Sequence, residues 1–307
     1  MSVVKSSTAT ATTATANPAA YVGRFAPSPT GDLHLGSLLT AVASFLDARA
    51  HRGRWLLRIE DLDRDREVKG ATARILQCLD SFGFAWDGPV VYQTARASLY
   101  EHALAQLQQS NRVFTCSCSR RQLRDEQYYP GTCRRSAPAA GAPAAIRFKV
   151  DSTWIHFHDH VQGDVTQDPA TGVGDFVVQR RDRVIAYALA VVVDDGAQGV
   201  THVVRGADLQ DSTAAQILLQ RALGLPQPLY AHVPLLTEPD GGKLAKSRRS
   251  PALEPARRSA QLCDIARLLG MNPPPELQHL QVAQFWDWAV AHWELKKVPV
   301  VRERALI

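Results

Sequence analysis

The sequence predicts an α/β protein built on a doubly wound, Rossmann-like parallel sheet, and the order of its first segments is the main reason. A short apolar strand over 21–25 leads into a loop rich in proline and glycine. A helical pattern then runs from Leu35 to an end near Gly53, and a second strand (55–59) and helix (68–82) follow. Strands that alternate with helices in this way are typical of parallel sheets covered by helices.

The rest of the chain continues this pattern around one interruption. Helices are expected over 96–110 and 210–223, strand candidates over 184–193 and 201–205, and two helices after Leu253 with 273–275 between them. The interruption holds the clustered cysteines and an Ala/Pro-rich stretch. We therefore divide the chain into a disordered leader (1–19), the first half of a Rossmann-like domain (20–112), a zinc-bearing insertion (113–183), the second half of the domain (184–250) and a short helical C-terminal region (251–307).

Composition narrows the class of protein. Hydrophobic residues make up 45% and charged residues 21% of 307 positions, and no apolar run approaches the roughly 18 residues of a membrane helix. The net charge of +5 leans mildly toward polyanionic partners, although a slightly basic enzyme explains it equally well. Five cysteines, an odd number with three in one cluster, favour metal ligation over disulfides and a reducing compartment, hence the cytoplasm.

The segment 24–37 (Arg-Phe-Ala-Pro-Ser-Pro-Thr-Gly-Asp-Leu-His-Leu-Gly-Ser) follows the first strand. In a doubly wound sheet this place is a crevice at a helix N-terminus, where backbone N–H groups favour an anion. Gly31 and Gly36 lack a Cβ and let a nucleotide approach the backbone, and His34 can donate to a phosphate oxygen. A plain turn that caps a helix, with His34 on the surface, is the alternative from spacing alone.

A second segment, 240–247 (Asp-Gly-Gly-Lys-Leu-Ala-Lys-Ser), joins glycines to Lys243 and Lys246. A loop of this kind can close over a triphosphate and stabilise the charge that develops between its phosphates. By itself it is equally a solvated basic turn, so its value lies in the combination with 24–37.

The two motifs together resemble the "HIGH" and "KMSKS" signatures of class I aminoacyl-tRNA synthetases. The segments 24–37, 58–63, 86–89 and 201–206 resemble the glutamyl-tRNA synthetases in particular, and the similarity covers about 20–250. Two departures occur: Ser37 replaces the second histidine of "HIGH", and Leu244 and Ala245 replace Met and Ser of "KMSKS".

Two further features resemble the glutamyl-Q tRNA(Asp) synthetase family. Only 248–307 follows the lysine loop, where full glutamyl-tRNA synthetases carry anticodon-binding domains, and 205–209 reads Arg-Gly-Ala-Asp-Leu. This resemblance implies ATP-dependent activation of L-glutamate and its transfer to queuosine in the anticodon loop of tRNA(Asp), by a protein expected to act as a monomer. The alternatives are a compact enzyme that charges the 3′ end of tRNA(Glu), a non-catalytic zinc-bearing RNA-binding paralogue, and another nucleotidyltransferase of the same architecture.

Recognition of glutamate requires cations for two carboxylates and an anion for one ammonium. Arg24 and Arg205 lie at predicted strand ends and can each contact a carboxylate, and Glu60 can take the ammonium. The resemblance implies glutamate contacts from Arg24, Ala26, Ser28, Glu60, Tyr187 and Arg205, and ATP contacts from Pro27, His34, Gly36, Ser37, Lys243 and Lys246. His34, Lys243 and Lys246 would be catalytic, with Mg²⁺ on the phosphates. The acidic residues Asp61, Asp63 and Asp65 are interpreted as helix-capping and salt-bridge residues.

Three cysteines, Cys116, Cys118 and Cys133, predict one structural zinc. The resemblance implies Tyr129 as the fourth ligand. Rival ligands are three histidines spaced to share one face of a strand, His156, His158 and His160, and reduced cysteines without metal remain a further alternative. Cys78 and Cys263 fall on apolar helical faces and are expected in the core.

Overall fold

The computed structural model describes residues 20–151, 153–237 and 253–305. Its strands are β1 (Val22–Phe25), β2 (Arg54–Ile59), β3 (Val91–Tyr92), β4 (Val113–Cys116), β5 (Ala145–Phe148), β6 (Ile155–Asp159), β7 (Gly163–Gln167), β8 (Val177–Gln179), β9 (His202–Gly206), β10 (Leu229–Val233), β11 (Leu235–Thr237) and β12 (Glu303–Ala305). Its α-helices are α1 (Leu35–Ala50), α2 (Ala71–Ser81), α3 (Ala97–Gln109), α4 (Thr132–Arg135), α5 (Pro169–Gly172), α6 (Tyr187–Ala197), α7 (Thr213–Leu223), α8 (Arg258–Leu268) and α9 (Val282–His292). Short 3₁₀ turns cover Arg64–Arg66, Gln93–Arg96, Ala207–Ser212, Pro255–Arg257, Pro275–His279 and Leu295–Lys297.

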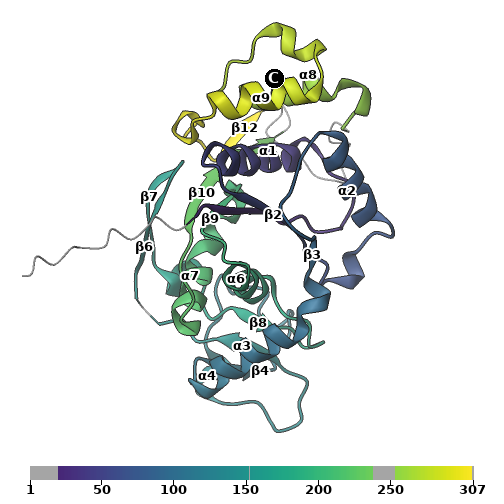
Figure 1. Cartoon of the computed structure of the whole chain (residues 1–307). Coiled ribbons are helices and arrows are strands. Elements are labelled where there is room, and N and C mark those ends of the chain that lie inside the picture. Colours follow the sequence, from purple (N-terminus) through teal and green to yellow (C-terminus); the bar gives the residue numbers. More distant parts are fainter. Residues whose placement is uncertain (1–19, 152, 238–252, 306–307) are drawn as a thin grey trace, which may run out of the picture.

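Two sheets with parallel strands lie at the centre of an α/β fold (Figure 1). The first has the order β1-β2-β3 and is parallel throughout. The second has the order β7-β6-β10-β9, in which only β7 is antiparallel to its neighbour. The backbone N–H of Thr201, just before β9, donates to the carbonyl oxygen of Val22 at 2.9 Å, so β9 lies beside β1.

Helices cover both faces of these strands because the strands are apolar on both sides. Along β2, Trp55 and Leu57 face a core formed with α1, α2, α8 and α9, whereas Leu56 faces a core formed with α3, α6 and α7. In β10, Ala231 faces the first of these cores and Tyr230 faces the second. Strands buried on both faces in this manner are characteristic of parallel sheets. Figure 1 shows α1, α8 and α9 on one side of the central strands and α3, α6 and α7 on the other.

The segment that contains the cysteines forms an antiparallel sheet of its own, with the order β4-β5-β8 and the short helix α4 beside it. The hairpin β6–β7 is different. Although it falls within the range expected for the insertion, β6 pairs with β10 in the second central sheet. The division of the chain into segments stays a prediction.

Most expected elements occur within a few residues of their predicted bounds, and one prediction is wrong. The strand candidate 184–193 is largely the helix α6, with Leu189, Ala190 and Val191 all buried. A continuous apolar run has no polar residues whose spacing would reveal a helical or a strand periodicity, so the sequence does not distinguish a buried helix from a buried strand. The pairing of β12 with β11 is a further feature that the sequence did not indicate.

Within the described part of the chain, no helix combines the length and the apolar character that a membrane crossing requires. The predicted leader (1–19) and the lysine pair Lys243 and Lys246 lie outside the described residues.

Candidate active site

A cleft of about 640 Å³ opens at the carboxyl ends of β1, β2 and β9. This is the edge of a parallel sheet where α/β proteins bind their ligands. The cleft is lined by every described residue that the sequence singled out for glutamate or ATP: Arg24, Ala26, Pro27, Ser28, His34, Gly36, Ser37, Glu60, Tyr187 and Arg205. The structure therefore brings these residues together, and their individual roles stay predictions.

The loop between β1 and α1 presents a helix N-terminus to the cleft. His34 is the N-cap of α1, and its Nδ1 accepts a hydrogen bond from the backbone N–H of Ser37 at 3.2 Å. Gly31 has a φ of 143°, a conformation that favours glycine, and a Cβ on Gly36 would lie 3.1 Å from the His34 ring. Backbone N–H groups at a helix N-terminus suit a phosphate.

Arg24, on β1, is held by a carboxylate from α6. Its Nε lies 3.3 Å from each carboxylate oxygen of Asp195, and both residues are buried. Asp195 also pairs with Arg58 on β2 at 2.8 Å. The sequence analysis missed both partners. The Asp194–Asp195 pair inside an apolar run was a usable signal, because carboxylates at buried positions are almost always paired.

Glu60 follows β2 and is the buried carboxyl group among the residues that line the cleft. Its side chain is 9% exposed and lies 3.6 Å from the Arg58 guanidinium. Burial raises the pKa of Glu60 to about 7, although the positive charges of Arg58 and Arg24 act in the opposite direction. A carboxyl group whose pKa is near 7 is a stronger base than usual, and it ionises readily when an ammonium group binds beside it.

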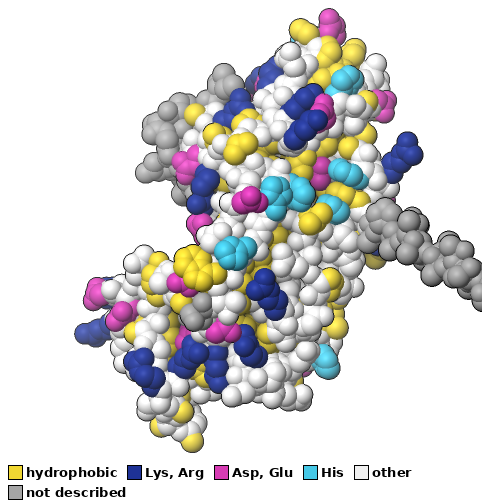
Figure 2. Space-filling view, turned by 90° about the vertical axis from the view of Figure 1, so that its left-hand side faces the viewer, with side chains coloured by type: hydrophobic (Ala, Val, Ile, Leu, Met, Phe, Trp, Pro, Cys, Tyr) yellow, Lys and Arg dark blue, Asp and Glu magenta, His cyan; other side chains and the backbone are white. Residues whose placement is uncertain are grey.

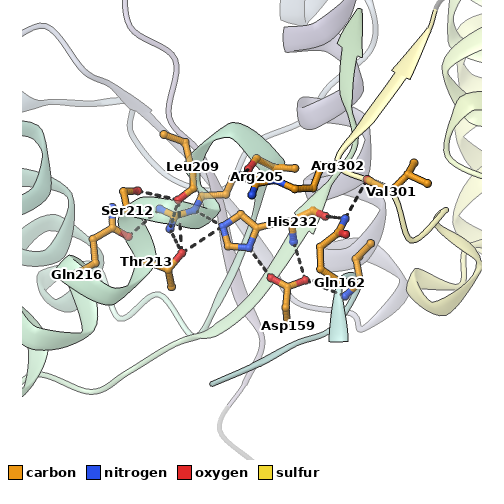
Figure 3. Close-up of polar contacts among 12 residues, drawn as sticks. Asp159, Gln162, Arg205, Leu209, Ser212, Thr213, Gln216, His232, Val301 and Arg302 are labelled. Atoms are coloured by element: carbon orange, nitrogen blue, oxygen red, sulfur yellow. Dashed lines mark hydrogen bonds and ion pairs between the residues drawn. The ribbon is translucent and has the colours of Figure 1, made fainter. Parts of the chain in front are cut away.

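Arg205, on β9, is buried and held on several sides (Figure 3). Its Nε–H donates to Nε2 of His232 at 2.9 Å, its Nη1 to Gln216 at 2.8 Å and its Nη2 to Thr213 at 3.0 Å. None of these partners was singled out from the sequence. His232 lies beside Arg205 only because β10 and β9 pair in that register.

The three charged residues predicted to bind glutamate carry charges that match those of this amino acid. Two guanidinium groups, Arg24 and Arg205, and one carboxyl group, Glu60, line a single cavity beside the N-terminus of α1, whose wall also contains Asp32, Arg66 and Asp208. Glutamate carries two carboxylates and one ammonium, so the charges of the three predicted residues are complementary to it. Tyr187, 38% exposed at the start of α6, adds a hydroxyl-bearing ring to the same wall.

A smaller cavity of about 210 Å³ adjoins this cleft and shares Ser28, Glu60 and Tyr187 with it. Its outer wall contains Arg66 and Arg180, both of which pair with Asp63. Asp63 thus has the salt-bridge role expected of it. Asp61 accepts hydrogen bonds from the backbone and side chain of Thr94.

The three cysteines predicted to bind zinc form the potential metal cluster found among the described residues. The sulfur atoms of Cys116, Cys118 and Cys133 lie within 4.8 Å of one another. The Tyr129 hydroxyl oxygen is 3.4 Å from the sulfur of Cys116 and 3.7 Å from that of Cys118. A tetrahedral zinc with Zn–S bonds of about 2.3 Å separates its ligand atoms by about 3.8 Å, so this donor set fits the ion.

Local electrostatics act in both directions on the donors of this cluster. Burial opposes ionisation of Cys133, yet hydrogen bonds from the Tyr129 hydroxyl and the Ser117 backbone lower its pKa to about 6. Burial raises the pKa of Cys118 and of Tyr129, whose ring centre lies 4.2 Å from the Arg147 guanidinium.

The rival histidines point elsewhere. His156 and His158 are exposed on β6, where they contact Thr166 and Asp164 of β7, and they are not part of the cysteine cluster. Figure 2, which looks onto the side where β6 and β7 lie in Figure 1, shows histidine side chains at the surface there. Cys263 is buried and Cys78 is partly buried, in agreement with their expected core positions.

Comparison with known proteins agrees with this geometry. Residues 21–273 match the family described as tRNA synthetases class I (E and Q), catalytic domain. The glutamyl-Q tRNA(Asp) synthetase of Thiobacillus denitrificans is 51% identical over 290 residues, which cover 92% of this chain and 96% of that protein. That of Pseudomonas paraeruginosa is 52% identical over 280 residues, which cover 91% and 95%.

The chain belongs to the glutamyl-Q tRNA(Asp) synthetase family. Solved structures of glutamyl-tRNA synthetases share the fold of this family member. The enzyme from Elizabethkingia anophelis superposes with a TM-score of 0.79 at 26% identity, over 93% of this chain and 68% of that one. A glutamate tRNA ligase from Elizabethkingia meningosepticum, solved with its amino acid, gives the same TM-score over 94% and 67%.

Proposed function

We propose that the protein activates L-glutamate with ATP as glutamyl-adenylate and transfers the glutamyl group to queuosine in tRNA(Asp). The observation that carries this proposal is the convergence of Arg24, Glu60 and Arg205 in one cleft beside the N-terminus of α1. Relatives that are 51–52% identical over more than nine tenths of the chain are named for this activity.

In the first step, an oxygen of the glutamate α-carboxylate attacks the α-phosphorus of ATP, and pyrophosphate leaves. The carboxylate is already ionised at neutral pH, so this step needs no general base. Catalysis then rests on positioning and on stabilisation of charge at the phosphates. Arg24 and Arg205 would bind the carboxylates of glutamate, Glu60 its ammonium, and Ala26, Ser28 and Tyr187 the remaining surface.

The nucleotide would lie along the loop that precedes α1, against Pro27, His34, Gly36 and Ser37. Mg²⁺ would help to neutralise the phosphates. We assign Lys243 and Lys246 to the leaving pyrophosphate from their motif alone, because they lie outside the described residues.

In the second step, a hydroxyl of the queuosine cyclopentenediol attacks the activated carbonyl. AMP leaves, and the hydroxyl proton is lost as the ester forms. The small cavity beside Glu60 and Tyr187 adjoins the place where this carbonyl would lie.

We also propose that Cys116, Cys118, Tyr129 and Cys133 hold one structural zinc. Four protein ligands close the coordination sphere, so the ion would fix the fold of its segment.

We further infer that the two central sheets are halves of one doubly wound sheet, since β9 is hydrogen-bonded next to β1. The clustered cysteines suit the reducing cytoplasm, and the family resemblance is the reason to propose a monomer.

Two assays test the proposal. The first is glutamate-dependent exchange of labelled pyrophosphate into ATP, which a non-catalytic RNA-binding protein lacks. The second incubates the protein with tRNA(Asp) with and without queuosine and, separately, with tRNA(Glu), and each product is digested to nucleosides and analysed by mass spectrometry. Glutamate on the modified base supports the proposal, whereas glutamate on the terminal adenosine of tRNA(Glu) would instead identify an enzyme that charges 3′ ends.

A further inference from the structure

Three neighbouring strands place a carboxylate, an imidazole and a guanidinium in a row behind the cleft (Figure 3). Asp159 ends β6, His232 lies in β10 and Arg205 in β9, and His232 pairs in register with Arg205. All three are buried, with exposures of 1%, 0% and 3%. Only Arg205 of the three lines the cleft.

The hydrogen-bond directions in this row follow from chemistry. The Nε–H of Arg205 can only donate, so the Nε2 of His232, 2.9 Å away, must accept. The imidazole proton is therefore on Nδ1, which donates to Oδ2 of Asp159. Burial lowers the pKa of His232. The hydrogen bond to Asp159 raises it and the positive charge of Arg205 lowers it, and the net pKa is below its usual value, so the ring stays neutral.

Asp159 is itself fixed so that only one of its oxygens is available to His232. Its Oδ1 accepts backbone N–H groups of Val161 at 3.0 Å, Gln162 at 2.8 Å and His232 at 3.1 Å. The other oxygen, Oδ2, is the one that receives the imidazole proton. The turn after β6 thus sets the orientation of the carboxylate, and the carboxylate sets the tautomer of His232.

We infer that Asp159 and His232 are positioning residues that hold the Arg205 guanidinium in the orientation required to bind a carboxylate of the substrate. The inference rests on the proposed function, in which Arg205 contacts glutamate. His232 holds the Nε edge, while Gln216 and Thr213 hold the outer nitrogens. Nη2 also donates to the carbonyl oxygen of Leu209 at 3.4 Å, so of the five N–H groups one, on Nη1, is left over to face the cleft. A fixed guanidinium loses less freedom on binding and so binds its carboxylate more tightly.

Asp159→Asn is the informative substitution because it keeps the shape and changes one donor. The three backbone N–H groups require an oxygen at the Oδ1 position, so the new NH₂ group takes the place of Oδ2. Its N–H then points at Nδ1 of His232 and drives the ring proton to Nε2. There it meets the Nε–H of Arg205, and two donors face each other at a distance of 2.9 Å.

We expect Asp159→Asn to raise the KM for glutamate in pyrophosphate exchange about tenfold, the usual effect of losing one hydrogen bond to a charged group. The KM for ATP and kcat should stay within about twofold, because the described residues proposed to bind the nucleotide lie in the loop before α1 and in its first turn, whereas Asp159 and His232 form a hydrogen-bonded chain to Arg205, and the chemistry is unchanged. His232→Gln keeps an acceptor near Nε2 and should retain most of the affinity for glutamate. His232→Leu removes the acceptor and should behave like Asp159→Asn.

A double-mutant cycle separates positioning from general damage. If Asp159 acts through the guanidinium, Asp159→Asn should change the KM for glutamate by less than about twofold in an Arg205→Lys background. Asp175→Asn is the matched control. Asp175 is another buried aspartate, and it accepts from the Val150 backbone at 2.8 Å and from Arg134 at 2.9 Å, outside the cleft. It should lower the melting temperature and leave the KM for glutamate unchanged.

The outcomes are distinguishable. A wild-type protein without glutamate-dependent exchange would overturn the proposed function and this inference with it. Normal wild-type exchange, together with an unchanged KM for glutamate in Asp159→Asn, would overturn the inference alone. So would equal losses for glutamate, ATP and kcat in Asp159→Asn, or a tenfold effect that persists in the Arg205→Lys background.

Discussion

At the level of single residues, Asp195 compensates the positive charge beside the cleft, because its carboxylate pairs with two guanidinium groups at once. Its carboxylate lies 3.3 Å from Arg24 and 2.8 Å from Arg58, and all three side chains are at least nine tenths buried. Buried charges are stable only with partners that compensate their loss of water. The glutamate site is therefore supported by a carboxylate that need not touch glutamate.

Asp195→Asn should leave both guanidinium groups without their shared counter-charge. We expect a loss of about 3 kcal/mol in the free energy of unfolding, measured with urea, as for other broken buried pairs. Asp264→Asn is the control, since its pair with Arg267 is half-exposed and should contribute less than about 1 kcal/mol. Equal effects of the two substitutions would contradict this account of Asp195.

If Glu60 binds the ammonium of glutamate as proposed, glutamate binding depends on pH. Burial raises its pKa to about 7 in the empty cleft, and only the ionised carboxylate attracts the ammonium of glutamate. A carboxyl with this pKa is mostly ionised at about pH 8 and mostly protonated at about pH 6. We expect kcat/KM for glutamate in pyrophosphate exchange to fall about tenfold from pH 8 to pH 6.

The Glu60→Gln variant provides the control for this profile. It cannot ionise, so its kcat/KM for glutamate should be low and nearly independent of pH over the same range. The wild-type profile should also flatten when glutamate is saturating, because the bound ammonium keeps Glu60 ionised. A wild-type kcat/KM that is flat between about pH 6 and pH 8 would show that Glu60 does not limit binding.

At the level of secondary-structure elements, the sequence predicts what regular apolar spacing and turn residues determine. Helix α1 begins at Leu35 as predicted, because the proline- and glycine-rich loop before it and the spacing within it agree. Helix α6 was mistaken for a strand because its buried residues form one unbroken apolar run. The two aspartates beside that run indicate buried carboxylates, but the pairing of Asp195 with Arg24, 171 positions away, follows from packing and leaves no pattern in the sequence.

The same distinction applies to the zinc segment. Three of its donors are recognisable from cysteine spacing, whereas Tyr129 came from resemblance, because a tyrosine has no metal-binding pattern of its own. In the structure its hydroxyl oxygen lies 3.4 Å from the sulfur of Cys116 and accepts the backbone N–H of Cys133 at 2.7 Å. Cys116 ends strand β4 and Cys133 lies in helix α4, so the donor cluster links these two elements.

Removal of the proposed zinc should unfold its segment locally. We expect one zinc per chain by elemental mass spectrometry and a melting temperature that falls by several degrees after chelation. Cys133→Ser should abolish zinc binding, and Tyr129→Phe should weaken it, whereas Cys78→Ala should retain one zinc because Cys78 lies on α2. A purified wild-type protein without zinc and with an unchanged melting temperature would contradict the assignment.

At the level of the whole molecule, the C-terminal helices complete the core on the α1 side of the sheet. The indole N–H of Trp286 donates to the carbonyl oxygen of Phe82 at 2.9 Å, and that of Trp293 donates to Asp47 on α1, also at 2.9 Å. Gly270 allows a close approach: its φ is 84°, and a Cβ there would lie 2.2 Å from the carbonyl oxygen of Lys297. A short helical region thus joins segments that are about 200 positions apart in sequence.

This region also supports the strand that follows His232. Strand β12 pairs with β11, which continues from β10 along the cleft, and Arg302 reaches Asp211 at 2.9 Å. Gln162 spans the carbonyl oxygens of His232 and Val301 at 2.9 and 3.1 Å (Figure 3). The C-terminal region therefore stabilises the same edge of the sheet that carries Arg205, although it contributes no charge to the cleft.

Trp286→Ala tests how much of the global stability depends on this packing. Trp286 is 8% exposed and contacts the rings of Phe45 and Phe84, so its loss opens a cavity in the main core. We expect a decrease of about 3–5 kcal/mol in the free energy of unfolding. Trp154→Ala, at a position that is 55% exposed, should cost less than about 1 kcal/mol.

The molecules of Trp286→Ala that remain folded should keep the wild-type KM for glutamate, because the cleft charges are held by Asp195 and His232 rather than by the C-terminal region. A large rise in that KM with little loss of stability would mean that the C-terminal region acts on the site directly.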